Sequence, residues 1–126
     1  MNDIKLMNKA ADNIRILAAS MVEKAKSGHP GGAMGGADFV NVLFSEFLVY
    51  DPKNPAWEGR DRYFQDPGHM SPMLYSVLAL AGKFTIDELK EFRQWGSVTP
   101  GHPEVNVMRG IENTSGPLGQ GHTYAV

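Results

Sequence analysis

Helical patterns run through most of this sequence, and only one short stretch is typical of a strand. Apolar residues from Ile4 to Ala25 recur at steps of three and four, which predicts a long amphipathic helix capped by Asn2 or Asp3. Gly28 suits a left-handed residue at the end of that helix. The strand-like stretch is RYFQ, residues 62–65. Four helices with one strand to pack against indicate an incomplete fold.

Three further helices are expected. The second covers residues 33–49, and its early glycines would leave one side of the first turn open to another backbone or a ligand. A flexible loop before a shorter helix is the alternative. The third begins with Ser71 as its cap and Pro72 in its first turn, and Gly82 ends it.

The fourth helix has the clearest signals. Residues 85–88, TIDE, form a capping box, and Leu89, Phe92 and Trp95 predict its buried side. Residues 97–121 are rich in Gly, Pro, Thr and Asn, which predicts an ordered loop. The chain then ends in helix-compatible residues, as if inside an element.

Composition excludes several classes of partner. The chain has 126 residues, enough for one domain at most, and its net charge of -2 gives no electrostatic attraction for nucleic acid. No run approaches the roughly 18 apolar residues of a membrane span. The chain has no cysteine, which fits a reducing compartment, so we expect a cytoplasmic protein.

All four histidines, His29, His69, His102 and His122, directly follow a glycine. Glycine lets the backbone approach a ligand closely, and the proline after His29 and His102 keeps each of these residues out of the helical region. The imidazole is then held on stiff, irregular backbone, which suits a group that binds hydroxyl or phosphate oxygen. A structural turn, in which the histidine bonds a carbonyl, is the competing interpretation.

Other chemistries lack their motifs. No two histidines have the close spacing of a zinc site, no serine lies in a G-x-S-x-G elbow, and no Walker phosphate loop is present, so we expect no metal ligand in this chain. Residues 115–121, SGPLGQG, offer backbone N–H and C=O groups together with Leu118 to a flat, partly polar ligand. A tight connection into a terminal helix is the alternative.

Four stretches together, SGHPGG, RDRY followed by GHMS, ELKEFRQWGSVTPGHPE and IENTSGPLGQG, resemble the N-terminal part of the transketolases. The resemblance covers nearly the whole chain. It implies an α/β, thiamine-diphosphate-binding fold that is incomplete and helix-rich in this fragment, with few strands. Residues 1–126 would be the N-terminal portion of the diphosphate-binding domain, and the remainder of that domain and the pyrimidine-binding domain would be absent.

The resemblance also implies an activity. Transketolases move a two-carbon ketol unit from a ketose phosphate to an aldose phosphate with thiamine diphosphate and Mg²⁺, in the pentose phosphate pathway, as homodimers. The Mg²⁺ ligands and the glutamate that activates the cofactor are expected beyond Val126. The isolated segment is therefore expected to be inactive, and to need the rest of the chain or a copy of itself to fold well. A noncatalytic binding or dimerisation module and one chain of a split transketolase are the alternatives.

The resemblance assigns roles to single residues. His29 is similar to a histidine that lines the active site beside the donor sugar and assists proton transfer, and His102 to one that binds the donor's terminal hydroxyl. His69 corresponds to a histidine that contacts the cofactor diphosphate. The loop that holds the cofactor through backbone groups and an apolar contact is matched by Gly116, Pro117 and Leu118.

Two positions depart from this pattern. Many transketolases have Ser-Asn-Gly-His where this chain has Asp66-Pro67-Gly68-His69, so the His69 ring is expected to sit slightly differently. His122 has no counterpart and is expected to be structural.

Overall fold

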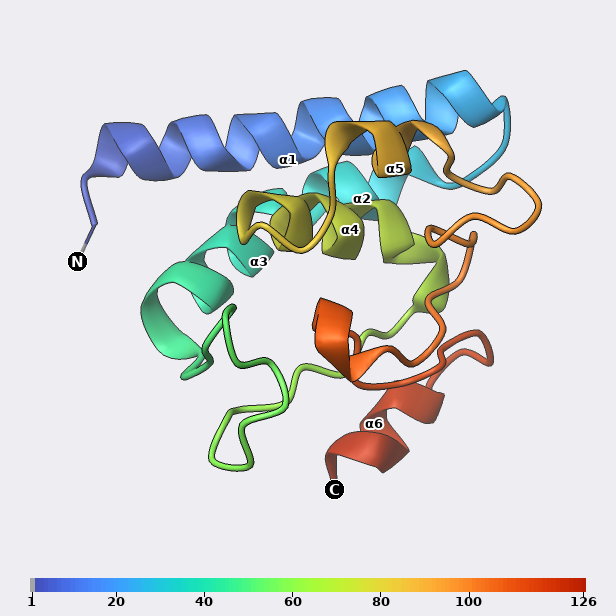
Figure 1. Ribbon diagram of the computed structural model, residues 1–126. Helices are drawn as coiled ribbons and strands as arrows, with labels where there is room; N and C mark the ends of the chain where they lie inside the picture. The colour runs from blue at the N-terminus through green and yellow to red at the C-terminus, as the bar shows by residue number, and fades with distance from the viewer. Residues whose placement is uncertain (1) are drawn as a thin grey trace.

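The computed structural model describes residues 2–126, and its elements are all helical (Figure 1). In chain order they are α1 (Ile4–Ala25), α2 (Pro30–Gly35), α3 (Ala37–Val42), the π-helical turn η1 (Leu43–Phe47), the 3₁₀ turn η2 (Gly68–Met70), α4 (Ser71–Leu80), α5 (Ile86–Lys90), the 3₁₀ turn η3 (Val107–Arg109) and α6 (Gln120–Ala125). None of the helices in this range is both long and apolar enough to cross a bilayer.

Helix α1 packs against α2, α3 and α4, and Figure 1 shows it lying across one side of the molecule. Asp3 caps it, as predicted, by accepting the N–H groups of Lys5 and Leu6. The predicted apolar stripe is buried in its middle and second half at Ala11, Ile14, Ala18 and Met21. Its first member, Ile4, is 70% exposed, so the prediction that the stripe is buried is wrong at the start of the helix. The left-handed residue at the end is Lys26 (φ 52°), two positions before the predicted Gly28.

The second helix begins at Pro30, three residues earlier than predicted, and is divided into α2, α3 and η1. Its glycines allow a close approach, as expected, although the neighbours are methionine side chains. A Cβ atom on Gly32 would lie 2.9 Å from Cγ of Met70, and one on Gly36 would lie 2.6 Å from Sδ of Met73. The absence of side chains there lets this helical segment pack tightly against η2 and α4.

Helix α4 is the centre of the core. Residues 71–78 are buried, because α1, α2, α3 and α5 all pack against this helix. Ser71 is the first helical residue and does not cap the helix as predicted. Its hydroxyl donates instead to the carbonyl of Gly101 (2.7 Å). Gly82 (φ 79°) follows the end of the helix, in agreement with the prediction.

The capping box of α5 is present as predicted: Oγ1 of Thr85 accepts the Glu88 N–H, and the Glu88 carboxylate accepts the Thr85 N–H. The helix is shorter than predicted, since it ends at Lys90. Phe92 is buried, but Trp95 is fully exposed and is not part of the predicted buried side. The chain has already turned away from helical geometry before Trp95.

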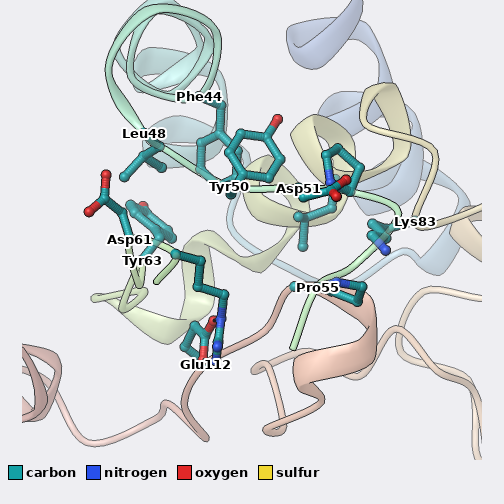
Figure 2. Close-up of a pocket in the computed structure, with 13 residues that line it drawn as sticks. Phe44, Leu48, Tyr50, Asp51, Pro55, Asp61, Tyr63, Lys83 and Glu112 are labelled. Carbon is teal, nitrogen blue, oxygen red and sulfur yellow. Dashed lines mark hydrogen bonds and ion pairs between the residues drawn. The ribbon is translucent and has the colours of Figure 1, made fainter. Parts of the chain in front are cut away.

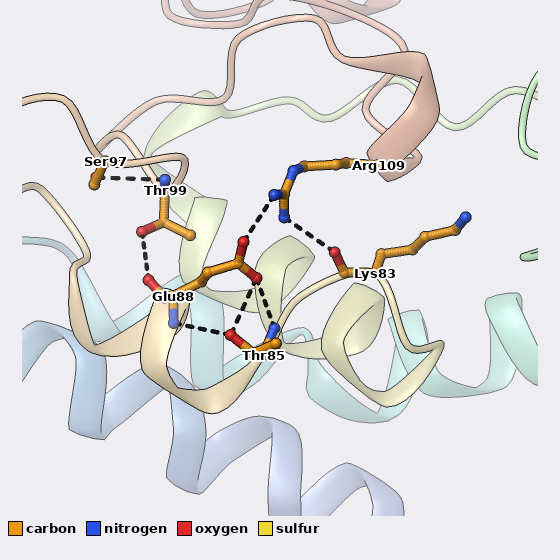
Figure 3. Close-up of polar contacts among 6 residues, drawn as sticks. All are labelled: Lys83, Thr85, Glu88, Ser97, Thr99 and Arg109. Carbon is orange, nitrogen blue, oxygen red and sulfur yellow. Dashed lines mark hydrogen bonds and ion pairs between the residues drawn. The ribbon is translucent and has the colours of Figure 1, made fainter.

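A network of polar contacts fastens the long irregular segment to α5 (Figure 3). The Arg109 guanidinium donates to Oε1 of Glu88 (2.7 Å) and to the carbonyl of Lys83 (3.2 Å). The hydroxyl of Thr99 donates to the Glu88 carbonyl (3.0 Å). This segment is therefore ordered without regular structure over most of residues 97–121, as predicted.

The strand expected at residues 62–65 is not formed, and residues 2–126 contain no strand at all. Only Asn106 and Ile111 form an isolated antiparallel bridge in that range. The Gln65 N–H donates to Oδ1 of Asn113 (3.1 Å), and the Asn113 amide donates back to the Gln65 carbonyl (3.5 Å). Both residues are buried, so a side chain satisfies the backbone groups that a neighbouring strand would otherwise pair.

Candidate functional site

Two of the histidines lie side by side although they are 40 positions apart in the sequence. His29 precedes α2 in an extended conformation (φ −124°, ψ 95°), and His69 lies within η2. Their ring centroids are 4.6 Å apart, with 51° between the ring planes. The packing of Gly32 against Met70 brings the two elements together and so places the two rings beside each other.

The third histidine belongs to the same cluster. His102 is an exposed residue, and its pKa is lowered from the ordinary value first by partial desolvation and then by the positive charges of Arg93, His69 and His29. The hydroxyl of Ser71, two residues after His69, donates to the carbonyl of Gly101 directly before His102 (2.7 Å), so the His102 loop lies against the segment that carries His69. The rings of His29 and His69 therefore lie together as expected, and the loop of His102 is next to them.

Two hydroxyl groups of α4 hold the loop that carries His102. Ser71 donates to the carbonyl of Gly101 (2.7 Å), and Tyr75 donates to the carbonyl of Pro100 (2.8 Å). Tyr75 is fully buried, and burial raises its pKa, so its hydroxyl remains a donor at neutral pH. The position of His102 is therefore set by a buried helix as well as by the loop itself.

The glycine-rich loop at residues 115–119 lies against both histidine segments. Ser115 donates its N–H to the carbonyl of Pro103 (3.0 Å), next to His102. A Cβ atom on Gly68 would lie 2.8 Å from the carbonyl carbon and oxygen of Ser115. Glycine before His69 is therefore required by the close approach of this loop.

Several groups in this loop remain open to a ligand. A Cβ atom on Gly116 would meet nothing within 4 Å, and Leu118 is 73% exposed. Pro117 is also exposed. The hydroxyl of Ser115 and Oδ1 of Asp66 are buried without a hydrogen-bond partner in the described residues. The loop thus presents backbone, one apolar side chain and nearby polar atoms that have no internal partner.

The fourth histidine has a different environment. His122 is on α6, its side chain is 87% exposed, and its Nδ1 lies 3.5 Å from Oδ2 of Asp66. The same Asp66 oxygen accepts the N–H of Gly119 (3.0 Å). These contacts connect the start of α6 to the residues before His69.

Sequence reasoning missed Arg93 and Ser27. Nη1 of Arg93 donates to the hydroxyl of Ser27 (3.0 Å), and both residues line an open groove with Pro100, Gly101, His102 and Glu104. Only one indication of these two residues was present in the sequence, namely that each lies shortly before a histidine of the site. Ser27 precedes His29 by two residues, and Arg93 precedes His102 by nine. Neither spacing predicts the contact, because it depends on how α1 and the residues after α5 pack.

A second pocket, with no histidine in its lining, contains three aromatic rings among aliphatic, proline and charged residues (Figure 2). The rings of Tyr50 and Tyr63 lie edge-on to Phe44, with centroids 5.6 and 5.4 Å away. Burial raises the pKa of Tyr63 to about 12. At its edge, the Arg60 guanidinium binds the Glu112 carboxylate through two hydrogen bonds of 2.6 and 2.9 Å, with both side chains only 9% exposed. This paired geometry satisfies both charges and joins the turn after η1 to the segment after η3.

The described residues contain no group of three or more His, Cys, Asp or Glu side chains arranged to hold a metal ion. The site as built from this chain is therefore three imidazoles, an arginine and a glycine-rich loop. Such a set can exchange protons and hydrogen bonds with a polar, oxygen-rich ligand and can contact a flat ring.

Comparison with known proteins defines the class. A sequence family described as "Transketolase, thiamine diphosphate binding domain" matches residues 6–126, so the chain is part of a domain of this thiamine-diphosphate-binding class. The chain belongs to the transketolase family. It is 53% identical to the transketolase of Buchnera aphidicola over 122 residues, and 52% identical to transketolase 1 of Escherichia coli over 117 residues. These alignments cover 96% and 92% of the chain, but 18% of each relative.

Solved structures agree with this assignment. A transketolase from Campylobacter jejuni superposes with a TM-score of 0.89 and 48% identity, over 95% of this chain and 19% of that one. A Pichia stipitis transketolase in complex with sedoheptulose-7-phosphate gives a TM-score of 0.87 and 45% identity, over 92% and 17%. The predicted thiamine-diphosphate-binding fold is confirmed, in a helix-rich form. The chain spans less than a fifth of the length of these relatives.

Proposed function

We propose that this chain forms part of the active site of a transketolase, which transfers a two-carbon ketol unit from a ketose phosphate to an aldose phosphate. The observation that carries the proposal is the convergence of His29, His69 and His102 beside a glycine-rich loop. In this proposal residues 1–126 are the N-terminal portion of the diphosphate-binding domain. The remainder of that domain and the pyrimidine-binding domain belong to parts of a transketolase that these residues do not include.

His29 and His102 are the proposed catalytic residues. His29 would lie beside the donor sugar and assist proton transfer, and His102 would bind the donor's terminal hydroxyl. The lowered pKa of His102 supports this role, because a neutral imidazole can donate from one nitrogen and accept at the other. The extended conformation of His29 directs its ring from the start of α2 toward His69.

His69, Gly116, Pro117 and Leu118 are the proposed cofactor-binding residues. The fit to thiamine diphosphate is supported by the open space at Gly116, the exposure of Leu118 and the unpartnered hydroxyl of Ser115. Cleavage and formation of the carbon–carbon bond would depend on the reactive ring carbon of the bound cofactor. His69 would hold the diphosphate, and Gly116, Pro117 and Leu118 would contact the cofactor through backbone groups and an apolar side chain.

The proposal extends to the surroundings of the site. Mg²⁺ would be held by ligands outside these 126 residues, and the active enzyme would be a homodimer in the cytoplasm that serves the pentose phosphate pathway. The lack of cysteine fits a reducing compartment. The sugar phosphate in the Pichia stipitis complex supports the assignment of sugar phosphates as substrates.

A chimera tests the proposed activity. The chain replaces the corresponding 117 residues of Escherichia coli transketolase 1, and ketol transfer between a ketose phosphate and an aldose phosphate is measured with thiamine diphosphate and Mg²⁺. We expect activity in the chimera. His29→Ala should lower kcat/KM by about 100-fold or more, as loss of a proton-transfer group does. His102→Ala should lower it by about 10-fold or more through the lost hydrogen bond to the donor, while the exposed His122→Ala is the matched control.

A folded chimera with no activity would contradict the enzyme assignment and favour a noncatalytic module. Calorimetric titration of the isolated chain with thiamine diphosphate and Mg²⁺ separates the two functions of the site. Heat of binding that is observed with the wild-type chain and is absent in Leu118→Ser would support cofactor binding by this loop alone. Full activity in His29→Ala or His102→Ala would remove those residues from the mechanism.

A further inference from the structure

Arg93 has an unusual backbone conformation that directs its side chain between two loops. Its φ of 62° is in the left-handed region, which residues other than glycine rarely adopt. Its N–H donates to the carbonyl of Thr99 (3.0 Å), which closes the loop of residues 93–99 after α5. This loop holds the residue in place despite the unfavourable dihedral angle.

The side chain reaches the first Gly-His-Pro loop, residues 28–30. Nη1 of Arg93 donates to the hydroxyl of Ser27 at 3.0 Å. Ser27 directly precedes this loop and lies two residues before His29. The contact spans 66 positions of sequence and joins the end of α1 to the turn after α5.

The same guanidinium lies against the second Gly-His-Pro loop, residues 101–103. A Cβ atom on Gly101 would lie 2.8 Å from Nε and 3.0 Å from Cζ of Arg93. Any residue other than glycine would therefore push the guanidinium away. Because Gly101 directly precedes His102, one arginine side chain touches the backbone of the second loop while it is bonded to the entrance of the first.

We propose that Arg93 is a positioning residue, which ties the two Gly-His-Pro loops together and thereby fixes His29 and His102 relative to each other. This inference rests on the proposed function, since the two histidines matter for catalysis only in the ketol-transfer site. Arg93 acts through Ser27 and Gly101, and no contact with substrate is required of it.

The charge of Arg93 reinforces this role. It lowers the pKa of His102, as do the charges of His69 and His29, after the larger effect of burial. Glu104 lines the same groove and is the acidic group there. Arg93 therefore contributes to the neutral state of the His102 ring as well as to the position of its loop.

Nuclear magnetic resonance on the whole 126-residue chain tests the inference without cofactor or turnover. The backbone amide signals of His29 and His102 are followed, and the pKa of His102 is measured from its ring signals. We expect Arg93→Met to shift both amide signals and to raise the pKa of His102. Arg93→Lys should keep the pKa low, because the charge remains, but should still shift both amides, because the guanidinium contacts are lost.

Ser27→Ala removes only one contact at an exposed residue, so it keeps the chain folded even if the Arg93 variants do not fold. It should shift the amide signals of both histidine loops. Arg62→Met, which changes an exposed arginine elsewhere, is the matched control and should shift neither. Unchanged signals of both loops in Ser27→Ala, or an unchanged His102 pKa in a folded Arg93→Met, would overturn the inference.

The chimera distinguishes this inference from the proposed function. If the resonance shifts occur while the chimera is inactive, Arg93 ties the loops but the site is not catalytic. In an active chimera, Arg93→Lys should raise KM for the ketose phosphate at least fivefold, because the two histidines no longer share one geometry. An unchanged KM and kcat in that variant would count against the inference.

Discussion

Gly68 lies where two loops of the site are in close contact. Replacing it with alanine would place a Cβ atom 2.8 Å from the backbone of Ser115, which cannot move as easily as a side-chain end. We expect Gly68→Ala to lower the free energy of unfolding by about 1 to 3 kcal/mol and to weaken thiamine diphosphate binding. Urea denaturation and calorimetric titration measure the two effects.

Gly31→Ala is the matched control for that variant. A Cβ atom on Gly31 would meet nothing within 4 Å, and the residue lies inside α2. Alanine there should be neutral or should stabilise the chain by up to about 1 kcal/mol, because glycine is a poor helix former. Equal losses of stability in the two variants would show that the contact between Gly68 and Ser115 is unimportant.

Glu88 makes stability depend on pH. Hydrogen bonds from Arg109 first, and then from the Thr85 backbone, lower the pKa of Glu88 from 4.5 to about 2. Its stabilising contribution is fully present above pH 4.5 and is lost as the pH falls toward 2, because the unfolded chain takes up the proton first. The side chain is 29% exposed, so we expect a contribution on the order of 1 kcal/mol.

Urea denaturation between pH 2 and 6 measures this effect at one protein concentration. In Glu88→Gln, the decrease in the free energy of unfolding between pH 6 and pH 2 should be smaller than in the wild type by on the order of 1 kcal/mol. Asp87→Asn is the control, since the Asp87 side chain is 89% exposed and bonded only to its neighbour Lys90. The same acid dependence in wild type and Glu88→Gln would refute the prediction.

Single residues show what the sequence could predict at the site and what it could not. The glycine before His69 and the proline after His102 marked two residues of the site, because glycine permits a close approach of another loop and proline restricts the backbone of the residue before it. Arg93 could not be found, because its partner Ser27 is 66 positions away. Trp95 was predicted to be buried from its spacing to Phe92, but the helix ends first.

At the scale of elements, α4 positions the loop of His102. The hydroxyl of Tyr75 is 2.8 Å from the carbonyl of Pro100, and its ring is fully buried. Tyr75→Phe keeps the ring but leaves that carbonyl without its donor, so we expect a loss of about 1 to 2 kcal/mol in stability. Hydrogen exchange should become faster at Gly101 and His102, since Pro103 has no amide hydrogen, while α4 keeps its protection.

Ser76→Ala is the control on the same helix. Ser76 is also buried, and its hydroxyl donates to the carbonyl of Pro72 within α4 (2.6 Å). Its removal should lower stability without faster exchange at Gly101 and His102. Faster exchange in both variants would mean that any weakening of α4 releases the loop, and that the Tyr75 hydroxyl has no special part.

The elements differ in how far sequence could define them. The caps at Asp3 and at residues 85–88 were predicted, because the side chain and the N–H group it accepts are close in sequence. The division of the second helix into three pieces was not predicted, and its packing against Met70 and Met73 depends on a distant part of the chain. The strand predicted at residues 62–65 is not formed for a related reason. Its pattern fits a sheet, but the backbone N–H of Gln65 is paired with the Asn113 side chain and not with another strand.

At the scale of the whole molecule, many large apolar side chains remain on the surface. On α3 and η1, Phe39 is 64% exposed, Val42 41% and Phe47 70%. We expect the dilute chain to melt broadly, and its melting temperature to rise with protein concentration, because association covers such side chains. Scanning calorimetry and sedimentation at low and high concentration measure this.

The double variant Phe39→Ser and Phe47→Ser should reduce the dependence on concentration. Met108→Ser changes a residue of similar exposure (64%) on η3 and is the control. A sharp, cooperative melt that does not depend on concentration would contradict the prediction. It would also show that the helical core around α4 is sufficient for this chain.

Trp95 stands fully exposed at the edge of the groove that contains Arg93 and His102. The chain has one other tryptophan, Trp57, which lines neither this groove nor the histidine loops. In a Trp57→Phe background, fluorescence therefore comes from a single indole at the mouth of the site. The emission wavelength of this indole and its quenching by acrylamide would report the binding of a ligand in the groove without an attached dye.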